Sequence, residues 1–257
     1  MTIIRSPLYF FDLLTTLVER ELRIRYKGSL LGLLWALLSP LGTVLIMYLV
    51  FSRVLSLNIP HYAAFIYSGL LPWTWFQAAI QTSAATLFDN RDLVRKPFFP
   101  RPVLPAVVTS TNFLLYLLAL PVLLILLWVE GVPLTPMLAW LPVVWIVQAL
   151  FTLACAMLVA ALGTLMRDIQ HFLGVGLLLW FYLTPIFYDL NRIGDTAARW
   201  LLLNPMTILV QAHRDVTFLG QPPNLAALGL CAAGSTLLLL VSLTVFRALE
   251  DSFVEVV

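Results

Sequence analysis

The charged side chains that could contact a partner gather in one short stretch, residues 89–102, which reads DNRDLVRKPFFPRP. It holds four basic residues and three prolines, although the whole chain is 61% hydrophobic and only 11% charged. Asp89 or Asn90 can cap a short helix, RDLVRK, which Pro97 ends because the residue before a proline avoids the helical conformation. With two phenylalanines beside it, this stiff segment is either a docking element or a loop that sets topology while its rings enter the lipid head groups.

The remaining side chains of chemical interest predict neither catalysis nor metal binding. His61, His171 and His213 are far apart along the chain, and each lies near an expected membrane interface. Cys155 and Cys231 fall inside apolar runs, where we expect small packing residues and not a disulfide. The sequence has no glycine-rich loop with a lysine that could hold phosphates, so any ATP chemistry is expected in a partner.

The elements that position these residues must lie in lipid. The mean hydropathy of +0.95 is far outside the range of soluble domains, and a net charge of +2 does not indicate nucleic-acid binding. The apolar runs are continuous and rich in Leu, which favours helices over the alternating strands of a β-barrel. The predicted fold class is therefore an all-α polytopic membrane protein, with a single domain over residues 1–257.

Six apolar runs are long enough to cross a bilayer as helices. They cover residues 29–51, 63–88, 103–129, 137–166, 171–187 and 225–246. The fifth is the shortest and contains Gly174, Gly176 and Pro185, so we do not expect it to cross as one straight helix. No run contains Asp, Glu, Lys or Arg, whereas an ion-driven carrier keeps an ionisable group at mid-membrane. This difference predicts an external source of energy.

Residues 8–27, before the first run, predict an amphipathic helix. Most of its polar side chains fall in one arc of a helical wheel, namely Asp12, Thr16, Glu19, Arg20, Arg23 and Lys27. Apolar residues fill the rest, as in helices that lie in the membrane interface. Glu21 and Arg25 interrupt the apolar side, and their spacing of four residues predicts an ion pair. Charges throughout the first twenty residues, without a small-residue cleavage site, argue against a removable signal peptide.

The distribution of Lys and Arg predicts the orientation. Eleven lie before the first run, between the second and third, between the fourth and fifth, or after the sixth, and four lie in the other connections. By the positive-inside rule, both termini and the loop at 89–101 are cytoplasmic.

Aromatic side chains cluster near the second and fifth runs. They are Trp73, Trp75 and Phe76 in LPWTWF, and Trp180, Phe181, Tyr182, Phe187 and Tyr188 in LWFYLTPIFY. Rings near span ends commonly form an interfacial belt. The alternative is that some of them line a conduit, where flat ring faces stack on the C–H faces of sugars.

Several motifs occur in order along nearly the whole chain. They are RELRIRYKGSLLGLLWALLSPL at 20–41, GLLPWTWF at 69–76, LVRKPFFPRPVLP at 93–105, RDI at 167–169, TPIFY at 184–188, LNP at 203–205 and HRD at 213–215. With these motifs the chain resembles the type-2 permeases of ABC exporters that move O-antigen, capsule or teichoic-acid polysaccharides. The resemblance implies a multi-pass protein of the bacterial cytoplasmic membrane, and a homodimer in which each permease docks on a separate ABC ATPase subunit.

The resemblance also implies roles for particular residues. The loop at 89–101 matches the cytoplasmic coupling helix, with the expected ATPase contacts Arg91, Asp92, Arg95, Lys96 and Arg101. Residues 8–27 match the interface helix, represented by Glu19, Arg20, Glu21, Arg23 and Arg25. Residues 188–224 match an external re-entrant region that closes the outer mouth. One departure is PFFP, which stands where a tyrosine or similar residue is expected after the coupling lysine.

The implied cargo is a polysaccharide on an undecaprenyl-type lipid, which needs a continuous path between two permeases. The first, second and fifth runs would form this path, with the candidate conduit or gate residues Trp73, Trp75, Phe76, Trp180, Tyr182, Phe187 and Tyr188. No catalytic residue, cofactor or metal is expected in this chain, since ATP and magnesium would belong to the ATPase. One alternative is an ABC permease of the same architecture for a small hydrophobic drug or lipid. Another is a membrane-embedded transferase, although the acidic and histidine cluster expected of such an enzyme is missing.

Overall fold

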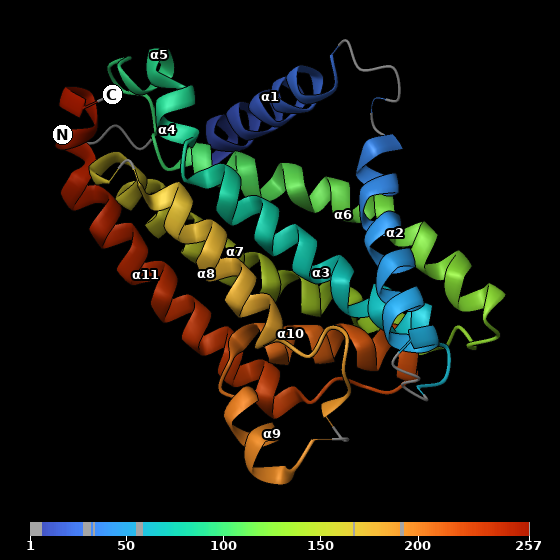
Figure 1. Ribbon diagram of the computed structural model, residues 1–257. Helices are drawn as coiled ribbons and strands as arrows, with labels where there is room; N and C mark the ends of the chain where they lie inside the picture. The colour runs from blue at the N-terminus through green and yellow to red at the C-terminus, as the bar shows by residue number, and fades with distance from the viewer. Residues whose placement is uncertain are drawn as a thin grey trace.

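The computed structural model describes residues 7–27, 32, 34–54, 59–166, 168–190 and 193–256, and the regular structure within these ranges is helical (Figure 1). The helices are α1 (Pro7–Tyr26), α2 (Leu34–Tyr48), η1 (Leu49–Val54), α3 (Tyr62–Ser83), α4 (Thr86–Asp89), α5 (Arg91–Val94), α6 (Val103–Val129), η2 (Pro136–Trp140), α7 (Leu141–Leu165), α8 (Ile169–Tyr182), α9 (Asp195–Leu201), α10 (Pro205–Arg214), η4 (Asp215–Leu219) and α11 (Leu225–Val256). The all-helical part of the prediction is thus confirmed for the described residues.

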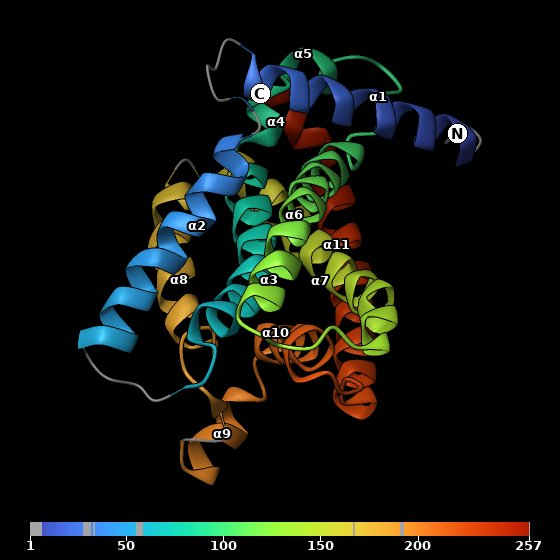
Figure 2. The ribbon, with the colours of Figure 1, turned by 90° about the vertical axis from the view of Figure 1, so that its right-hand side faces the viewer.

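Three helical stretches in the described ranges are long and apolar enough to cross a membrane. They are Val103–Val129, Pro136–Leu165 and Leu225–Glu250, and each exceeds the roughly 20 residues that a spanning helix needs. They correspond to α6, to η2 with α7, and to α11. In the bundle, α7 packs against α3, α6 and α11, while α2 and α8 both flank α3 (Figures 1 and 2).

Several predicted boundaries move where proline or polar residues interrupt a run. The second run, 63–88, divides into α3, which ends at Ser83, and the separate helix α4. The fifth run is interrupted as expected, because α8 ends at Tyr182. Its 14 residues would extend only about 21 Å as an α-helix, which is less than the bilayer core of about 30 Å. The sixth run continues beyond its predicted end to Val256. Ser29, the predicted start of the first run, lies outside the described residues.

The central helix α3 is held to its neighbours by polar side chains as well as by packing. Its carbonyl at Pro72 accepts a hydrogen bond from Gln148 Nε2 of α7 at 2.7 Å. Gln148 Oε1 lies 2.6 Å from His213 Nε2 of α10. Both side chains are buried, and a hydrogen bond is electrostatically stronger there than in water. His213, expected near an interface, therefore belongs to the interior that joins α3, α7 and α10.

The two ends of the bundle differ in their elements. At one end, which we name the α1 end, α1 lies across the bundle beside α4, α5 and the last turns of α11 (Figure 2). At the opposite end, which we name the α10 end, α10 packs against α3 and α7, and α9 projects away from them (Figure 1). Residues 89–101, at the α1 end, are thus separated from α9 and α10 by the length of the bundle.

Gly163→Ala will destabilise the fold. A Cβ at Gly163 would overlap the backbone carbonyl of Ala84, where α7 passes the turn between α3 and α4. Backbone cannot move aside as a flexible side chain can, and overpacking of this kind costs about 1–3 kcal/mol. Thermal unfolding of the purified protein in detergent should show a lower melting temperature than the wild type.

Gly229→Ala in α11 is the matched control, because nothing lies within 4 Å of its Cβ position. Alanine favours a helix over glycine by about 1 kcal/mol, so this variant should melt at the wild-type temperature or above it. Equal melting temperatures for the two variants would contradict the close approach at Gly163.

Candidate functional site

Residues 89–101, which we name the coupling segment, lie at the α1 end and contain one turn of helix. This helix, α5, covers only Arg91–Val94 and is shorter than the predicted RDLVRK. Asn90 occupies the cap position, but its side chain makes no cap hydrogen bond. Its Nδ2 donates instead to the carbonyl of Thr86 at 3.0 Å. The predicted side-chain cap is therefore wrong, and the amide joins the coupling segment to α4.

Buried contacts anchor the coupling segment to the bundle. Val94 is fully buried in a cluster that includes Leu17 of α1. Arg101 Nη1 lies 2.7 Å from Glu250 Oε1 of α11, and its Nε donates to the carbonyl of Val94 at 3.2 Å. The Arg101 side chain is only 16% exposed. It therefore ties the segment to α11, a contact for which the sequence gives no signal.

The outer surface of the coupling segment is charged and aromatic. Four of the five predicted contact residues are exposed, namely Arg91, Asp92, Arg95 and Lys96. Phe98 is 77% exposed and has a φ of 65°, which a bulky residue rarely adopts. Phe99 is half-buried against the cluster around Val94. The segment thus presents a rigid surface in which one ring and four charged side chains face outward.

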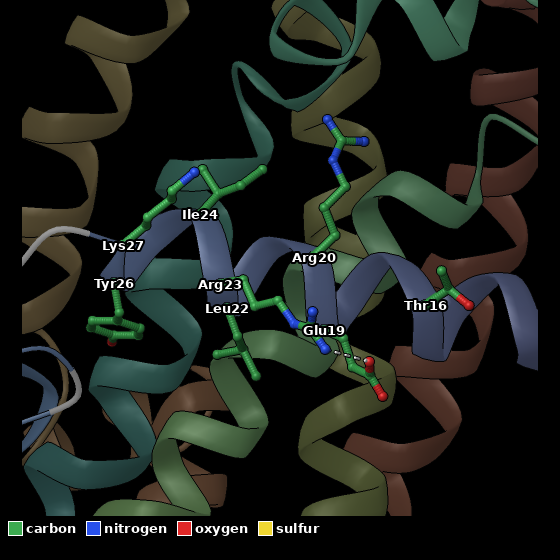
Figure 3. Close-up of a pocket in the computed structure, with 8 residues that line it drawn as sticks. All are labelled: Thr16, Glu19, Arg20, Leu22, Arg23, Ile24, Tyr26 and Lys27. Atoms are coloured by element: carbon green, nitrogen blue, oxygen red, sulfur yellow. Dashed lines mark ion pairs between the residues drawn. The ribbon is translucent and has the colours of Figure 1, made fainter.

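The amphipathic helix predicted at 8–27 corresponds to α1, and its polar arc is exposed as expected. The six polar residues of the predicted arc are all exposed, while Leu17 and Val18 are buried. On the exposed face, Glu19 Oε2 and Arg23 Nη2 lie 3.6 Å apart (Figure 3). In the same view Arg20 and Leu22 extend in opposite directions from α1, and Arg20 lines a small cavity with Thr86 and Asn90. A shallow groove of about 860 Å³ follows this helix.

The predicted pair between Glu21 and Arg25 is confirmed, with 3.5 Å between Oε1 and Nη2. Arg25 Nη1 also donates to Asn112 Oδ1 of α6 at 3.2 Å. Asn112 is buried, and it gives no periodic signal in the sequence that could have revealed this contact. Burial raises the pKa of the Tyr26 hydroxyl, while the neighbouring charge of Arg25 lowers it. The contacts of Arg25 with Glu21 and Asn112 fix the C-terminal half of α1 on the bundle.

The two predicted aromatic clusters meet in one network between α3 and α8. The ring centroids of Trp73 and Phe181 are 5.7 Å apart, and those of Phe76 and Trp180 are 5.1 Å apart. Trp73, Trp75 and Phe76 are at most 2% exposed. These three rings therefore pack the core and contact neither lipid nor a solute in this conformation.

The aromatic residues nearer the α10 end are more accessible. Tyr182 is 56% exposed, and Phe187 and Tyr188 are half-buried. The Phe187 ring lies 5.8 Å from Tyr182 and 5.0 Å from Tyr188, and it stacks on Phe51 of η1 at 5.3 Å. Of the seven rings proposed for a conduit, those of Tyr182, Phe187 and Tyr188 lie at a surface. Trp180 lies between them and the core.

Residues 183–188, which we name the outer loop, follow α8 and are held by side chains from three other elements. Asn204 Oδ1 accepts from Trp180 Nε1 at 2.8 Å, and its Nδ2 donates to the Leu183 carbonyl at 3.2 Å and to Thr184 Oγ1 at 3.1 Å. Tyr62 of α3 donates from its hydroxyl to the Phe187 carbonyl at 2.8 Å. These bonds hold a non-helical segment in one conformation.

Arg214 makes the most buried contact with the outer loop. It is 2% exposed, and its Nη1 and Nη2 donate to the carbonyls of Pro185 and Ile186 at 2.9 and 3.0 Å. Its guanidinium lies 3.8 Å above the ring of Phe65. A Cβ at Gly69 would lie 2.7 Å from Nη2, so glycine leaves room for the guanidinium. The sequence treated Arg214 only as an external charge that helps set orientation, and the structure places it inside the protein.

These features define a helical membrane protein with a rigid charged segment at one end and a loop fixed by a buried arginine at the other. Residues 12–218 match the family described as "ABC-2 type transporter". The chain belongs to this family, and membership implies an ABC ATPase partner and a membrane setting. The chain is 37% identical to the "O-antigen export system permease protein RfbA" of Myxococcus xanthus, over 98% of both chains.

Two further relatives are also named as export or transport proteins. An O-antigen export system permease protein of Klebsiella pneumoniae is 32% identical, over 96% of both chains. The polysialic acid transport protein KpsM of Escherichia coli is 24% identical, over 91% of this chain and 92% of its own. The similarity therefore extends across helices at both ends of the bundle.

Proposed function

We propose that the chain is the membrane-spanning subunit of an ATP-driven exporter that moves a lipid-linked polysaccharide across the bacterial cytoplasmic membrane. The observation that carries this proposal is the similarity over nearly the full chain to O-antigen export permeases. The relative with a polysialic acid cargo supports a polysaccharide and gives no support for a small hydrophobic drug. The chain itself would be a transport subunit, with ATP and magnesium bound by the separate ATPase.

In the proposed arrangement, a single domain over residues 1–257 crosses the membrane six times with both termini in the cytoplasm. The three long apolar helices and the shorter apolar helices Leu37–Phe51 and Ile169–Tyr182 supply five of the crossings, and α3 supplies the sixth. Residues 8–27 would be the interface helix, 89–101 the coupling segment and 188–224 the external region. This assignment puts the α1 end in the cytoplasm, in agreement with its excess of Lys and Arg.

The ATPase would dock on the α1 end. The exposed Arg91, Asp92, Arg95 and Lys96 would contact it directly, while Arg101 and Val94 make the segment rigid enough to transmit a push. The exposed face of α1, with Glu19, Arg20 and Arg23, would lie against the same subunit, and Glu21 and Arg25 would hold α1 in place. Charge complementarity across such a surface favours one partner over others.

The path for the polymer would form between two copies of the chain. Apolar side chains of α2 and α8 are exposed in the single chain, among them Trp35, Leu38, Phe172 and Leu179. A second copy could cover these faces and leave a passage that Tyr182, Phe187 and Tyr188 line at the outer mouth. Many weak ring contacts would allow each sugar to leave as easily as it enters.

Deleting the gene for this chain tests the proposed function. The polysaccharide should disappear from the cell surface and accumulate on its lipid in the cytoplasmic leaflet, and a plasmid copy should restore export. Labelling of intact and permeabilised cells with a lectin or antiserum separates the two pools. An unchanged surface polysaccharide, together with lost efflux of a hydrophobic drug, would contradict the proposal.

Tyr182→Ala will slow export about two- to tenfold and will lower the melting temperature much less than Trp73→Ala does. The ring is mostly exposed, so its loss removes contacts with the polymer, and aromatic contacts contribute about 0.5–1.5 kcal/mol. Trp73→Ala is the contrasting variant, because this fully buried ring should cost about 3–5 kcal/mol of stability. The measurements are the rate of surface polysaccharide appearance and thermal unfolding in detergent. A Tyr182→Ala protein that exports normally would show that the ring does not face the path.

A further inference from the structure

A cavity of about 390 Å³ opens at the α10 end of the bundle. It lies between the start of α3, the connection after α6, and the end of α10 with η4, and its lining includes His61, Phe65, Asp189, Gln211, Arg214 and Phe218. Its volume falls near the lower limit of the 300–1,000 Å³ usual for small-molecule sites. It is separate from the groove along α1 and from the aromatic rings buried between α3 and α8.

Polar groups of opposite hydrogen-bonding character line this cavity. Arg214 uses Nη1 and Nη2 on the outer loop and on Gln211, while its Nε is buried with no acceptor among the described residues. Gln211 Oε1 accepts from Arg214 at 2.9 Å. That contact engages Gln211 Oε1, and the Nε2 of the same amide is a hydrogen-bond donor. Asp189 adds a carboxylate to the same lining. A ligand here would meet both donors and an acceptor.

Aromatic rings form the apolar part of the lining. Phe65 and Phe218 meet edge to face, with 5.7 Å between their centroids. The guanidinium of Arg214 lies over the Phe65 ring and fixes it from one side. His61, at the rim, has a φ of 52° without being glycine. The packed rings of Phe65 and Phe218 therefore lie beside the polar groups of the cavity.

The charges around Arg214 favour a neutral ligand over an anion. Asp189 and Asp215 already act on the guanidinium as opposite charges, so a bound phosphate or carboxylate would compete with two carboxylates. A sugar ring has hydroxyls that donate and accept, and C–H faces that pack on aromatic rings. Its hydroxyls could accept from Gln211 and donate to Asp189 without adding charge.

We propose that this cavity binds one or two sugar residues of a glycan on the outer side of the membrane. The inference rests on the proposed function for its cargo, since the chain would then hold the emerging polymer at each protomer. A bound residue at the exit would oppose backward sliding of the polymer while the ATPase resets. The site belongs to a single chain and does not depend on how two copies meet.

Saturation-transfer NMR on the full chain with its ATPase in nanodiscs tests the site directly. The probes are the methyl glycosides of glucose, galactose, mannose, rhamnose and N-acetylglucosamine, titrated one at a time. At least one should bind, and Gln211→Ala and Asp189→Ala should each weaken it about three- to tenfold, as expected for the loss of one hydrogen bond. Gln81→Ala, at an exposed position of α3 outside the cavity lining, should bind as the wild type does.

Wild-type melting temperatures for both cavity variants confirm that the weakening is local. If either variant fails to fold, the other decides the result. Binding of none of the five sugars, equal binding by wild type and cavity variants, or displacement of the sugar by inorganic phosphate would each overturn the assignment. The gene deletion tests the proposed function independently of whether this cavity binds sugar. Sugar binding by a chain whose loss leaves surface polysaccharide unchanged would contradict the proposed function, whereas lost export without sugar binding would contradict only the site.

Discussion

Charge reversal at Arg95 and Lys96, made together as glutamates, will reduce ATP-driven export more than tenfold while the chain still inserts and dimerises. Both side chains are exposed on the coupling segment, whereas its buried contacts with the bundle are made by Val94 and Arg101. The charge reversal leaves those two residues unchanged. The partner's groove must be complementary to them, and like charges placed together at such an interface cost several kcal/mol. Co-purification of the ATPase and the rate of export should fall together.

The matched control is Arg199→Glu, an exposed arginine of α9 at the opposite end of the bundle. It changes the net charge in the same direction but lies where no ATPase would bind. Its ATPase recovery and export should remain at the wild-type level. Raising the salt concentration should weaken the wild-type complex, because exposed charges are screened beyond a Debye length of about 10 Å at 0.1 M. Normal export by the double variant would exclude the coupling segment as the docking site.

The sequence predicted the helical class and the exposed polar arc of α1 because both depend on local pattern. Residues 8–27 place six polar side chains in one arc, and all six are exposed in the structure. The interruption of the fifth run was predictable for the same reason, since two glycines and a proline weaken a helix locally. Boundaries were less accurate, as at α3, where packing of Gly163 against Ala84 accompanies a turn that hydropathy does not reveal.

Contacts between distant segments were not predictable. Arg214 binds the carbonyls of Pro185 and Ile186, Arg101 reaches Glu250, and Arg25 reaches Asn112. The residues of each pair are far apart in sequence. From the sequence alone, a single arginine is interpreted as a surface charge or as one that sets orientation. A weak signal was available at Gly69, within GLLPWTWF, because a glycine in a buried helix can leave room for a bulky neighbour. It does not say which side chain takes that room.

Arg214→Lys will produce a folded chain whose outer loop is no longer fixed. A lysine keeps the positive charge but presents one ammonium in place of the planar fork that now reaches the carbonyls of Pro185 and Ile186 together. The ammonium therefore cannot contact the carbonyl of Pro185, the carbonyl of Ile186 and the ring of Phe65 all at once, as the guanidinium does. An unsatisfied buried acceptor costs about 1–3 kcal/mol. We therefore expect a lower melting temperature, faster amide hydrogen exchange at residues 186–188, and slower export.

Arg214→Ala should be more severe, because it removes the guanidinium that both carbonyls and two nearby carboxylates face. Breaking a buried charged contact from one side costs about 3–5 kcal/mol, a large share of the stability of an ordinary domain. Arg199→Ala is the matched control, since an exposed arginine away from such contacts should change stability by less than about 0.5 kcal/mol. Tyr62→Phe separates anchoring of the loop from burial of charge, because it deletes only the hydrogen bond to the Phe187 carbonyl. If all the Arg214 variants melted and exchanged like the wild type, the buried guanidinium would not be what holds the outer loop, and its fixed conformation would have to come from Asn204 and Tyr62 alone.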